Sequence, residues 1–384
     1  MRKGSPAAKK TETLLYADSE KSADMLYFGG IFVPDPFIAF TDGDKRVAVM
    51  SPLEIARAKK ESQFEEVLGQ DELKEAIALD RRGHTVGAAD FICHLARERG
   101  IGRFKVSREF PFGLARDLIG KGLELHVEEG HLFPAREIKT DEEARWIEEG
   151  NAASSAGFRV MERFLRESEI RKGYLWHGGR RLTSERVQEA IAVACLGMGA
   201  TAANTIVAGG DQACDPHCRG SGPLRADSLI IVDIFPRVHK TGYHGDMTRT
   251  YLKGRASEEQ RSLVETVFKA QQWAVQEHRA GKSGAIIDAG VRKQFDAAGF
   301  KTRKEADGTP VGFFHGLGHG LGLDVHESPR VNAAGGRLRR GQVITVEPGL
   351  YYPGLGGARV EDVVRVCSGA PELLSKHPYR WHFR

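Results

Sequence analysis

The sequence predicts an α+β protein with a smaller N-terminal α/β domain and a larger C-terminal domain, and three observations lead to this prediction. A chain of 384 residues is too long for one ordinary hydrophobic core. Its first third alternates short strand-like runs with helix-like stretches. The remainder carries long helical patterns and apolar β-type runs that end in carboxylates. We expect the two domains at residues 11–134 and 140–384.

In the N-terminal domain the clearest element is a β-hairpin. Two β-type runs, residues 37–40 and 46–50, flank a turn in which Gly43 tolerates a positive φ. A helix is expected over residues 86–99, where the chain reaches Gly100. Two short strands are expected at residues 104–106 and 124–127.

The C-terminal domain is expected to begin after residues 133–135 with a long helix. Thr140 and Glu143 have the spacing of a capping box, in which each side chain bonds the other residue's backbone N–H. A second helix is expected over residues 184–195, and a third opens with another capping box at Ser257. The apolar runs 229–232 and 343–346 are expected to be strands.

Composition excludes several classes of protein. The charged fraction of 28% and the mixed apolar content argue against disorder. A net charge of +4 spread over this length does not predict nucleic-acid binding. The basic first residues lead into no apolar run, and no stretch is long enough to span a bilayer. We therefore expect a cytoplasmic protein whose five cysteines are reduced thiols.

Four carboxylates stand out by their position after the two apolar runs of the C-terminal domain. Asp233 closes the first run and Asp246 follows thirteen positions later, while Glu347 closes the second and Glu361 follows fourteen later. Both stretches look like hairpins that could aim two carboxylates at one point. Taken alone, each acid is better explained as an ordinary surface residue. Four together, with too few nearby Lys or Arg, indicate divalent metal, because a buried carboxylate needs a compensating cation.

A histidine-rich segment between these carboxylates is the third element. His315, His319 and His326 lie within twelve positions among alternating glycines. The glycines predict an extended or looped segment where the backbone comes close to another group. The Gly-x-Gly spacing also matches a phosphate loop weakly, since no helix-forming stretch follows.

These stretches together resemble the pita-bread-fold metallopeptidases, which include methionine aminopeptidase, Xaa-Pro aminopeptidase and prolidase. The order of the stretches along the chain also agrees, and the similarity covers roughly residue 140 to the end. Residues 24–30 resemble, more loosely, an early strand of the accessory domain in prolidases and Xaa-Pro aminopeptidases. The resemblance rests on Asp233 with residues 242–250, on 318–322 with 326–329, on 346–351 and on 358–362.

The resemblance implies a C-terminal pita-bread domain that binds two divalent metal ions per chain. Asp233 would hold one ion, Asp246 and Glu361 would bridge both, and His319 and Glu347 would complete the second site. Mn²⁺ is the expected metal, with Co²⁺, Zn²⁺ or Fe²⁺ as alternatives.

The resemblance also implies roles for residues around the metals. His217, His315 and His326 would line the substrate pocket, Glu347 would shuttle a proton, and Arg359 would orient a ligand carboxylate. For each histidine alone a structural role competes with the catalytic one. A small zinc knuckle at residues 214–218 is a further alternative, which the absence of a second Cys/His pair at finger spacing disfavours.

The function that follows is cleavage of the bond between an N-terminal residue and proline, by an aminopeptidase or a dipeptidase. The expected partner is a short peptide with proline in second position, without nucleic acid or membrane, in a homodimer. The alternatives are the same metal site acting on a small non-peptide amide or related metabolite, and a non-catalytic binding homologue. One departure bears on substrate preference, because residues 235–240 make the first hairpin about two residues longer than the family pattern implies.

Overall fold

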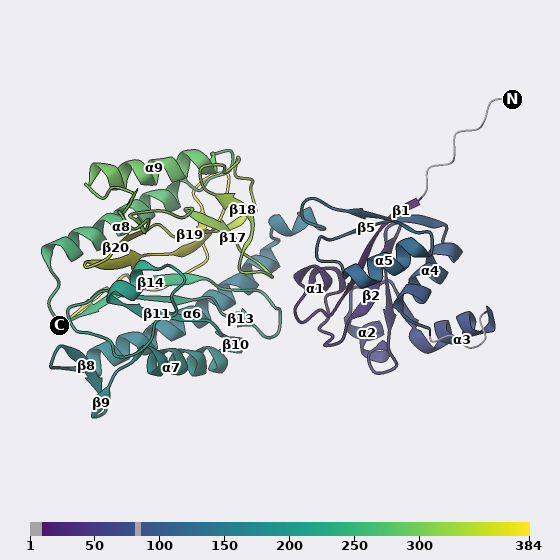
Figure 1. The fold of residues 1–384 in the computed structure, drawn as a ribbon, viewed down its shortest axis with the longest axis horizontal. Coiled ribbons are helices and arrows are strands. Elements are labelled where there is room, and N and C mark those ends of the chain that lie inside the picture. The colour runs from purple at the N-terminus through teal and green to yellow at the C-terminus, as the bar shows by residue number, and fades with distance from the viewer. Residues whose placement is uncertain (1–9, 81–85) are drawn as a thin grey trace. The chain divides into compact units, whose positions relative to one another are not determined.

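The structure is a computed structural model that describes residues 10–80 and 86–384. The chain divides into two compact units after Pro134 (Figure 1). Among the described residues, no helix is both long and apolar enough to cross a membrane.

The N-terminal unit contains one mixed six-stranded sheet. Strands β1 and β2 and strands β2 and β3 pair antiparallel, whereas β5 pairs parallel to β1, β6 parallel to β5, and β4 parallel to β3. The predicted hairpin is confirmed as β2 and β3, with Gly43 at φ 65° in the turn. The predicted strands at 104–106 and 124–127 are confirmed within β5 and β6. In spatial order the strands are β4 (Glu66–Gly69), β3 (Lys45–Met50), β2 (Phe37–Asp42), β1 (Lys10–Ala17), β5 (Ile101–Val106) and β6 (Glu124–Val127).

Helices cover both faces of this sheet. Because strand side chains alternate between faces, Val47 and Val49 join one core cluster and Ala48 and Met50 join the other. The helix expected over residues 86–99 is confirmed as α4. The helices are α1 (Ala23–Gly29), α2 (Ile55–Glu61), α3 (Gln70–Asp80), α4 (Ala88–Glu98) and α5 (Phe112–Gly120).

One expectation in this unit is wrong, because residues 24–30 are not a strand. Ser22 caps the N-terminus of α1 by accepting a hydrogen bond from the backbone N–H of Met25. Gly30 ends the helix in the left-handed conformation, at φ 63°. The cap at each end therefore outweighs the strand-like apolar composition of the segment.

The C-terminal unit places its two larger sheets between two pairs of helices, α6 and α7 on one side and α8 and α9 on the other (Figure 1). One sheet has the order β11-β12-β14-β24 and the other the order β18-β17-β19-β22-β23. Their strands are β11 (Ile206–Gly209), β12 (Ile230–Ile234), β14 (Met247–Lys253), β24 (His382–Phe383), β17 (Gly318–Gly320), β18 (Glu327–Val331), β19 (Val343–Val346), β22 (Asp362–Arg365) and β23 (Glu372–Leu373).

The C-terminal unit also contains smaller sheets beside the two larger ones. There is one three-stranded sheet, β7-β8-β9, and there are three two-stranded pairs, β10 with β13, β15 with β16 and β20 with β21. Their strands are β7 (Glu169–Arg171), β8 (Tyr174–His177), β9 (Arg180–Arg181), β10 (Ala200–Thr201), β13 (Arg237–Val238), β15 (Arg303–Lys304), β16 (Pro310–Val311), β20 (Gly349–Tyr352) and β21 (Gly356–Arg359).

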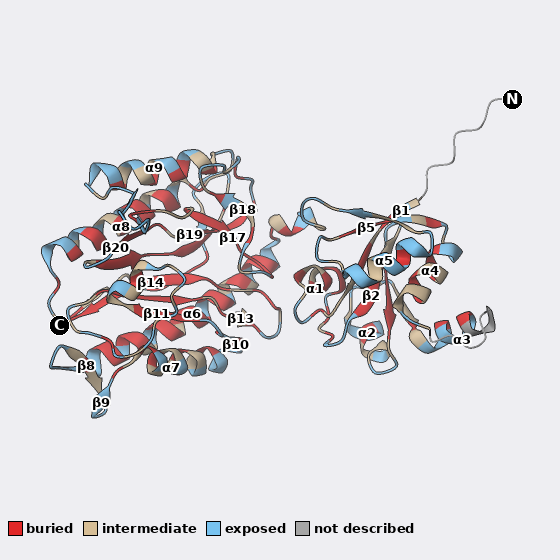
Figure 2. Cartoon of the chain, viewed as in Figure 1, coloured by how far each residue is buried: buried red, intermediate tan, exposed pale blue. Residues whose placement is uncertain are grey.

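Each pair of helices in this unit packs on its own core. Residues of α6 and α7 share a core cluster with β12 and β14, and residues of α8 and α9 share another with β19 and β22. Figure 2 shows the buried residues along the strands and the inward helix faces. Both predicted capping boxes are present, at Thr140 and Ser257. The helices are α6 (Asp141–Glu167), α7 (Ser184–Gly197), α8 (Glu258–Glu277) and α9 (Gly284–Ala297), with short 3₁₀ turns at Pro134–Glu137 and Gly210–Cys214.

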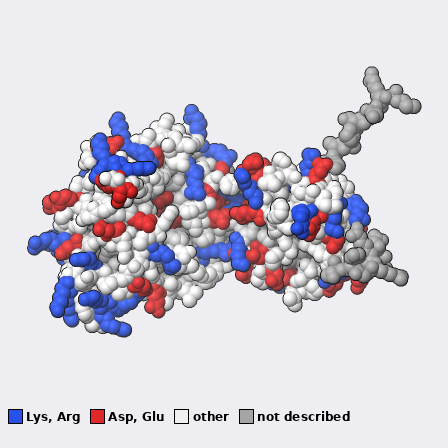
Figure 3. Space-filling view, in the orientation of Figure 1, with Lys and Arg blue, Asp and Glu red and all other residues white. Residues whose placement is uncertain are grey.

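The charged surface is mixed over most of the visible face. Figure 3 shows acidic and basic side chains interspersed, with basic side chains gathered over β8 and β9. Arginines of β7 and β9 there lie over the Trp176 ring, with Arg171 at 5.8 Å and Arg181 at 6.0 Å from its centroid.

Candidate metal centre

Two strand pairs bring the four predicted carboxylates together. In the first, β12 pairs antiparallel with β14, so that Asp233 lies opposite Thr248, two residues beyond Asp246. In the second, β19 pairs antiparallel with β22, with Val346 opposite Asp362. Glu347 and Glu361 are therefore neighbours of that last pair. Each predicted hairpin is confirmed as an antiparallel pair, and the second one also carries the inserted hairpin β20–β21 between its arms.

The histidine segment supplies the fifth side chain from β17. His319 Nε2 lies 3.4 Å from Glu347 Oε1 and 3.8 Å from Asp246 Oδ2. Ligand atoms of Asp246, His319 and Glu361 all lie within 4.8 Å of one another. The glycines on either side permit close backbone approach, since a Cβ at Gly318 would fall 1.9 Å from the Thr345 carbonyl oxygen.

The protonation state of His319 indicates that a cation belongs between its ring and the neighbouring carboxylates. Its Nδ1 lies 3.1 Å from the Gly320 carbonyl oxygen, which only accepts, so Nδ1 carries the proton and Nε2 presents a lone pair. Burial, and then the neighbouring His326, lower the pKa of His319 to about 3, so the ring is neutral. A lone pair that faces two carboxylate oxygens is electrostatically unfavourable unless a cation lies between them.

The carboxylates lead to the same conclusion. Burial, and then the charges of neighbouring acids, raise the pKa of Asp246 and Glu361 well above the usual range. Burial raises the pKa of Glu347 to about 8. Asp233 Oδ1 is buried without a hydrogen-bond partner among the described residues. The donor set therefore fits divalent cations, which would neutralise these groups and use the free oxygen.

Arg359 organises one side of this group from the end of β21. Its Nη2 donates to Asp233 Oδ2 at 2.7 Å, its Nη1 to the Tyr351 hydroxyl at 3.0 Å, and its Nε to Thr248 Oγ1 at 3.2 Å. Thr248 in turn donates its hydroxyl proton to Glu361 Oε2 at 2.7 Å. One guanidinium group thus fixes the orientation of two potential ligands, Asp233 directly and Glu361 through Thr248.

The three predicted pocket histidines share one neighbourhood but differ in availability. Burial, and then the neighbouring Arg330, lower the pKa of His326, and His217 contributes to the lowered pKa of both His315 and His326. His217 and His326 are exposed, and the His326 ring meets the His319 ring edge to face at 4.5 Å. His315 is engaged within the protein, since Nδ1 donates to the Gly316 carbonyl at 2.8 Å and Nε2 accepts from Tyr351 at 2.9 Å. Burial, and then Arg359, lower the pKa of His315 to about 3.

Sequence reasoning missed three polar residues that hold the ligands. Tyr351 and Thr248 lie inside the stretches that carry the family resemblance, which implies no role for them. Asn151 comes from the middle of α6, where its side-chain oxygen accepts the backbone N–H of Asp246 at 2.9 Å. A polar residue on the apolar stripe of α6, between Ile147 and Phe158, was the available signal for Asn151.

Two other features of the sequence are the longer first hairpin and the Cys214–Cys218 run. Residues 235–240 of the first hairpin include β13, which pairs with β10. Cys214 and Cys218 are free thiols. The group of potential metal ligands found among the described residues includes neither of them, so nothing in this part of the chain supports a zinc knuckle.

Comparison with known proteins agrees with this geometry. The model of metallopeptidase family M24 matches residues 145–368. An Xaa-Pro dipeptidase of Pyrococcus furiosus is 28% identical over 360 residues, which are 93% of this chain and 92% of that protein. The solved Xaa-Pro dipeptidase of Bacillus anthracis superposes with a TM-score of 0.80 at 22% identity, over 97% of this chain and 95% of that one. The X-Pro aminopeptidase of Thermotoga maritima gives 0.79 at 23% identity, over 97% of each.

The structural likeness shows the fold, and the family model shows the relationship. The model covers more than half of the chain and includes all five candidate ligands. The resemblance noticed in the sequence is therefore confirmed. The chain belongs to metallopeptidase family M24 and is a metallopeptidase of the pita-bread fold.

Proposed function

We propose that this metallopeptidase cleaves the bond between an N-terminal residue and proline, with two divalent metal ions per chain. The observation that carries the proposal is the group of four carboxylates, three of them buried and Glu347 half-buried, that gathers with the neutral His319 ring. The similarity to an Xaa-Pro dipeptidase along nearly the whole of both chains supports proline as the second residue. The substrate is then a short peptide, and both dipeptidase and aminopeptidase activity are consistent with it.

The proposed distribution of ligands uses every member of the group. Asp233 would hold one ion, Asp246 and Glu361 would serve both ions, and His319 and Glu347 would complete the second site. Oxygen-rich ligation with one imidazole suits Mn²⁺, and also Fe²⁺, Co²⁺ and Zn²⁺. Two ions would carry the charge that four carboxylates require beyond what the guanidinium of Arg359, which bonds Asp233, supplies.

The surrounding side chains have separate tasks in this proposal. When bound, the ions would supply a nucleophilic hydroxide at neutral pH and polarise the scissile carbonyl. Glu347 accepts a proton from the attacking water and passes it to the leaving amine. The exposed rings of His326 and His217 donate hydrogen bonds to the developing oxyanion. Arg359 keeps Asp233 oriented, and His315 holds the Tyr351 hydroxyl that Arg359 also contacts.

Peptide hydrolysis tests the proposal directly. Protein freed of metal with a chelator is assayed against Xaa-Pro dipeptides and Xaa-Pro-Yaa tripeptides, with Xaa-Ala peptides as controls, before and after addition of Mn²⁺. We expect metal-dependent release of the N-terminal residue from the proline peptides alone. Equal cleavage of the alanine controls, or turnover only of small cyclic amides, would contradict the proposed specificity. Sedimentation of the same sample tests the homodimer that the family likeness suggests.

A further inference from the structure

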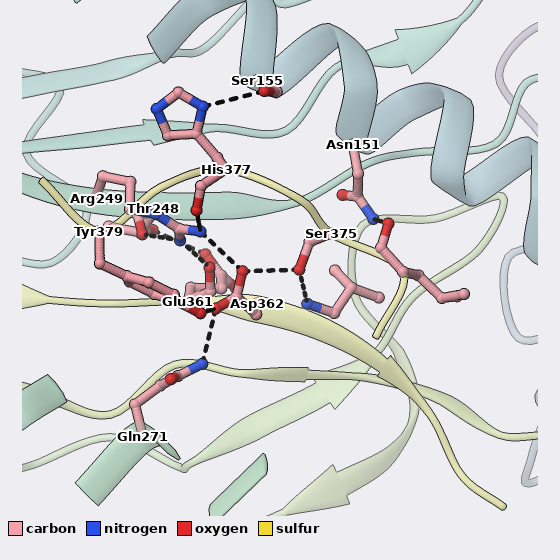
Figure 4. Close-up of polar contacts among 12 residues, drawn as sticks. Asn151, Ser155, Thr248, Arg249, Gln271, Glu361, Asp362, Ser375, His377 and Tyr379 are labelled. Carbon is pink, nitrogen blue, oxygen red and sulfur yellow. Dashed lines mark hydrogen bonds and ion pairs between the residues drawn. The ribbon is translucent and has the colours of Figure 1, made fainter. Parts of the chain in front are cut away.

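Directly after the proposed bridging ligand Glu361, Asp362 is the centre of a buried polar network (Figure 4). Asp362 is 1% exposed. Its carboxylate accepts hydrogen bonds from Arg249 Nη2 at 2.9 Å, from Gln271 Nε2 at 2.9 Å and from Ser375 Oγ at 2.7 Å. The Tyr379 hydroxyl donates a further, short hydrogen bond. Such a group is costly to bury, and these donors offset the loss of water.

Arg249 connects Asp362 to the backbone of the metal centre. It is 2% exposed, and its Nη1 donates to the carbonyl oxygens of Glu361 at 2.7 Å and Thr248 at 2.9 Å. Thr248 is also the residue whose hydroxyl bonds Glu361 Oε2. The guanidinium group therefore holds the main chain of the ligand and of its hydrogen-bond donor at the same time.

The partners on the far side of this network come from the C-terminal segment 374–379. Arg249 Nη2 donates to the His377 carbonyl oxygen at 3.1 Å, and the His377 ring lies between Ser155 and Glu162 of α6, 3.0 Å from each. The backbone oxygen of Leu374 accepts a hydrogen bond from Asn151 Nδ2 at 3.0 Å. The oxygen of the same Asn151 side chain accepts the backbone N–H of Asp246. Both proposed bridging ligands are thus tied to one segment.

This segment lies outside the part of the chain that the family model matches, which ends at residue 368. We propose that Asp362, Arg249 and the C-terminal segment 374–379 form a positioning network that sets where Glu361 and Asp246 present their carboxylates to metal. The inference rests on the proposed function, because the network can position metal ligands only if these carboxylates bind metal. Asp362 and Tyr379 are positioning residues that act through Glu361.

Metal binding tests the inference. Each network variant is paired with a control that makes the same substitution at a buried residue outside the network. Tyr379→Phe deletes one hydroxyl of the network, and Tyr251→Phe deletes a buried hydroxyl without a partner among the described residues. Asp362→Asn removes the central charge, and Asp288→Asn removes an equally buried charge paired with Arg292 in α9. Mn²⁺ is titrated calorimetrically into chelator-treated proteins, well below each melting temperature, and the visible spectrum of the Co²⁺ forms is recorded.

We expect the network variants to bind Mn²⁺ more weakly than wild type, by about 10- to 100-fold for Asp362→Asn and nearer the lower figure for Tyr379→Phe. Their Co²⁺ spectra should change, and both controls should match wild type. If the network variants bind Mn²⁺ as wild type does while only their melting temperatures fall, the network is structural and the inference is overturned. If wild type itself binds no Mn²⁺, the proposed function fails first. Should Asp362→Asn not fold, Tyr379→Phe and Ser375→Ala give the same answer.

Discussion

At the scale of single residues, the planar guanidinium of Arg359 bonds three partners in an arrangement that a lysine ammonium cannot reproduce. Its three nitrogens reach Asp233, Tyr351 and Thr248 in different directions. A lysine ammonium carries the same charge but is a single point on a flexible stem, so it cannot hold three partners in fixed directions. Geometry rather than charge is therefore what Arg359 contributes.

The first prediction is that Arg359→Lys weakens metal binding and activity together, by about 10- to 100-fold. The charge stays, so a loss must come from the orientation of Asp233 and Thr248. Arg99→Lys is the matched control, because Arg99 makes a comparable fork with Glu66 and Asp42 in the N-terminal unit. Calorimetric metal titration and peptide hydrolysis measure the two effects. Unchanged metal affinity in Arg359→Lys would show that charge alone suffices.

The second prediction separates substrate contacts from metal ligands. His326→Ala and His217→Ala should bind metal as wild type does but lose turnover by about a hundred- to a thousand-fold, since each removes one donor to the oxyanion. Both residues are exposed, and the His326 ring contacts the ring of the buried His319, whose Nε2 faces the carboxylates. Metal content by elemental analysis is compared with kcat on an Xaa-Pro peptide. Loss of metal from either variant contradicts this division of roles.

The ligands could be predicted from the sequence because each lies in a motif with its own neighbours. The residues that hydrogen-bond and position these ligands could not be predicted in this way. Asn151 precedes Asp246 by ninety-five positions, and Tyr379 follows Glu361 by eighteen, so only the fold brings them together. A buried polar residue in an apolar pattern shows that a partner exists without showing which partner it is.

At the scale of secondary structure elements, helix α6 and the loop before β14 meet through two glycines. A Cβ at Gly150 would lie 2.3 Å from the backbone nitrogen of Gly245, and one at Gly245 would lie 2.2 Å from the carbonyl carbon of Gly150. Both neighbours are backbone and cannot move aside. This contact lets Asn151 reach the N–H of Asp246.

The third prediction follows from that contact. Gly150→Ala should destabilise the protein by about 1–3 kcal/mol, because the added methyl group forces α6 and the loop apart. It should also weaken metal binding through Asp246. Gly197→Ala in α7 is the control, since its added Cβ meets nothing within 4 Å and alanine favours a helix. Thermal unfolding and metal titration are compared for the two variants, and equal behaviour would contradict the close approach.

Elements with local signals could be predicted from the sequence. The capping boxes of α6 and α8 and the turn between β2 and β3 each depend on residues a few positions apart. The two-residue strands β10, β13, β15 and β16 could not, because so short a pairing leaves no periodic pattern. The segment before Gly30 misled the prediction, because its apolar residues suit either a helix or a strand and only its caps decide.

At the scale of the whole molecule, the metal centre is expected to contribute to the stability of the C-terminal unit. Asp246, Glu361 and Asp233 are buried within it, and without cations their charges repel one another. The N-terminal unit has its own two core clusters. Metal binding should therefore stabilise the unit that holds the ligands.

The fourth prediction is that chelation lowers the melting temperature and that Mn²⁺ restores it. A ligand bound only by the folded state, at a hundred times its Kd, adds about 2.7 kcal/mol per site. Calorimetric unfolding before and after chelation measures the effect. The control is Glu361→Ala, which removes a buried acid and should respond to Mn²⁺ much less. Identical unfolding of wild type with and without metal would contradict the prediction.

Metal stoichiometry tests the central claim most directly. Elemental analysis and calorimetric titration of wild type, Asp246→Ala and Glu361→Ala with Mn²⁺ or Co²⁺ count the ions each chain holds. We predict two equivalents for wild type and weakened binding of both ions in each variant, because Asp246 and Glu361 are proposed to bridge. Full metal content in both variants, or one equivalent in wild type, would contradict a two-metal centre built on these carboxylates.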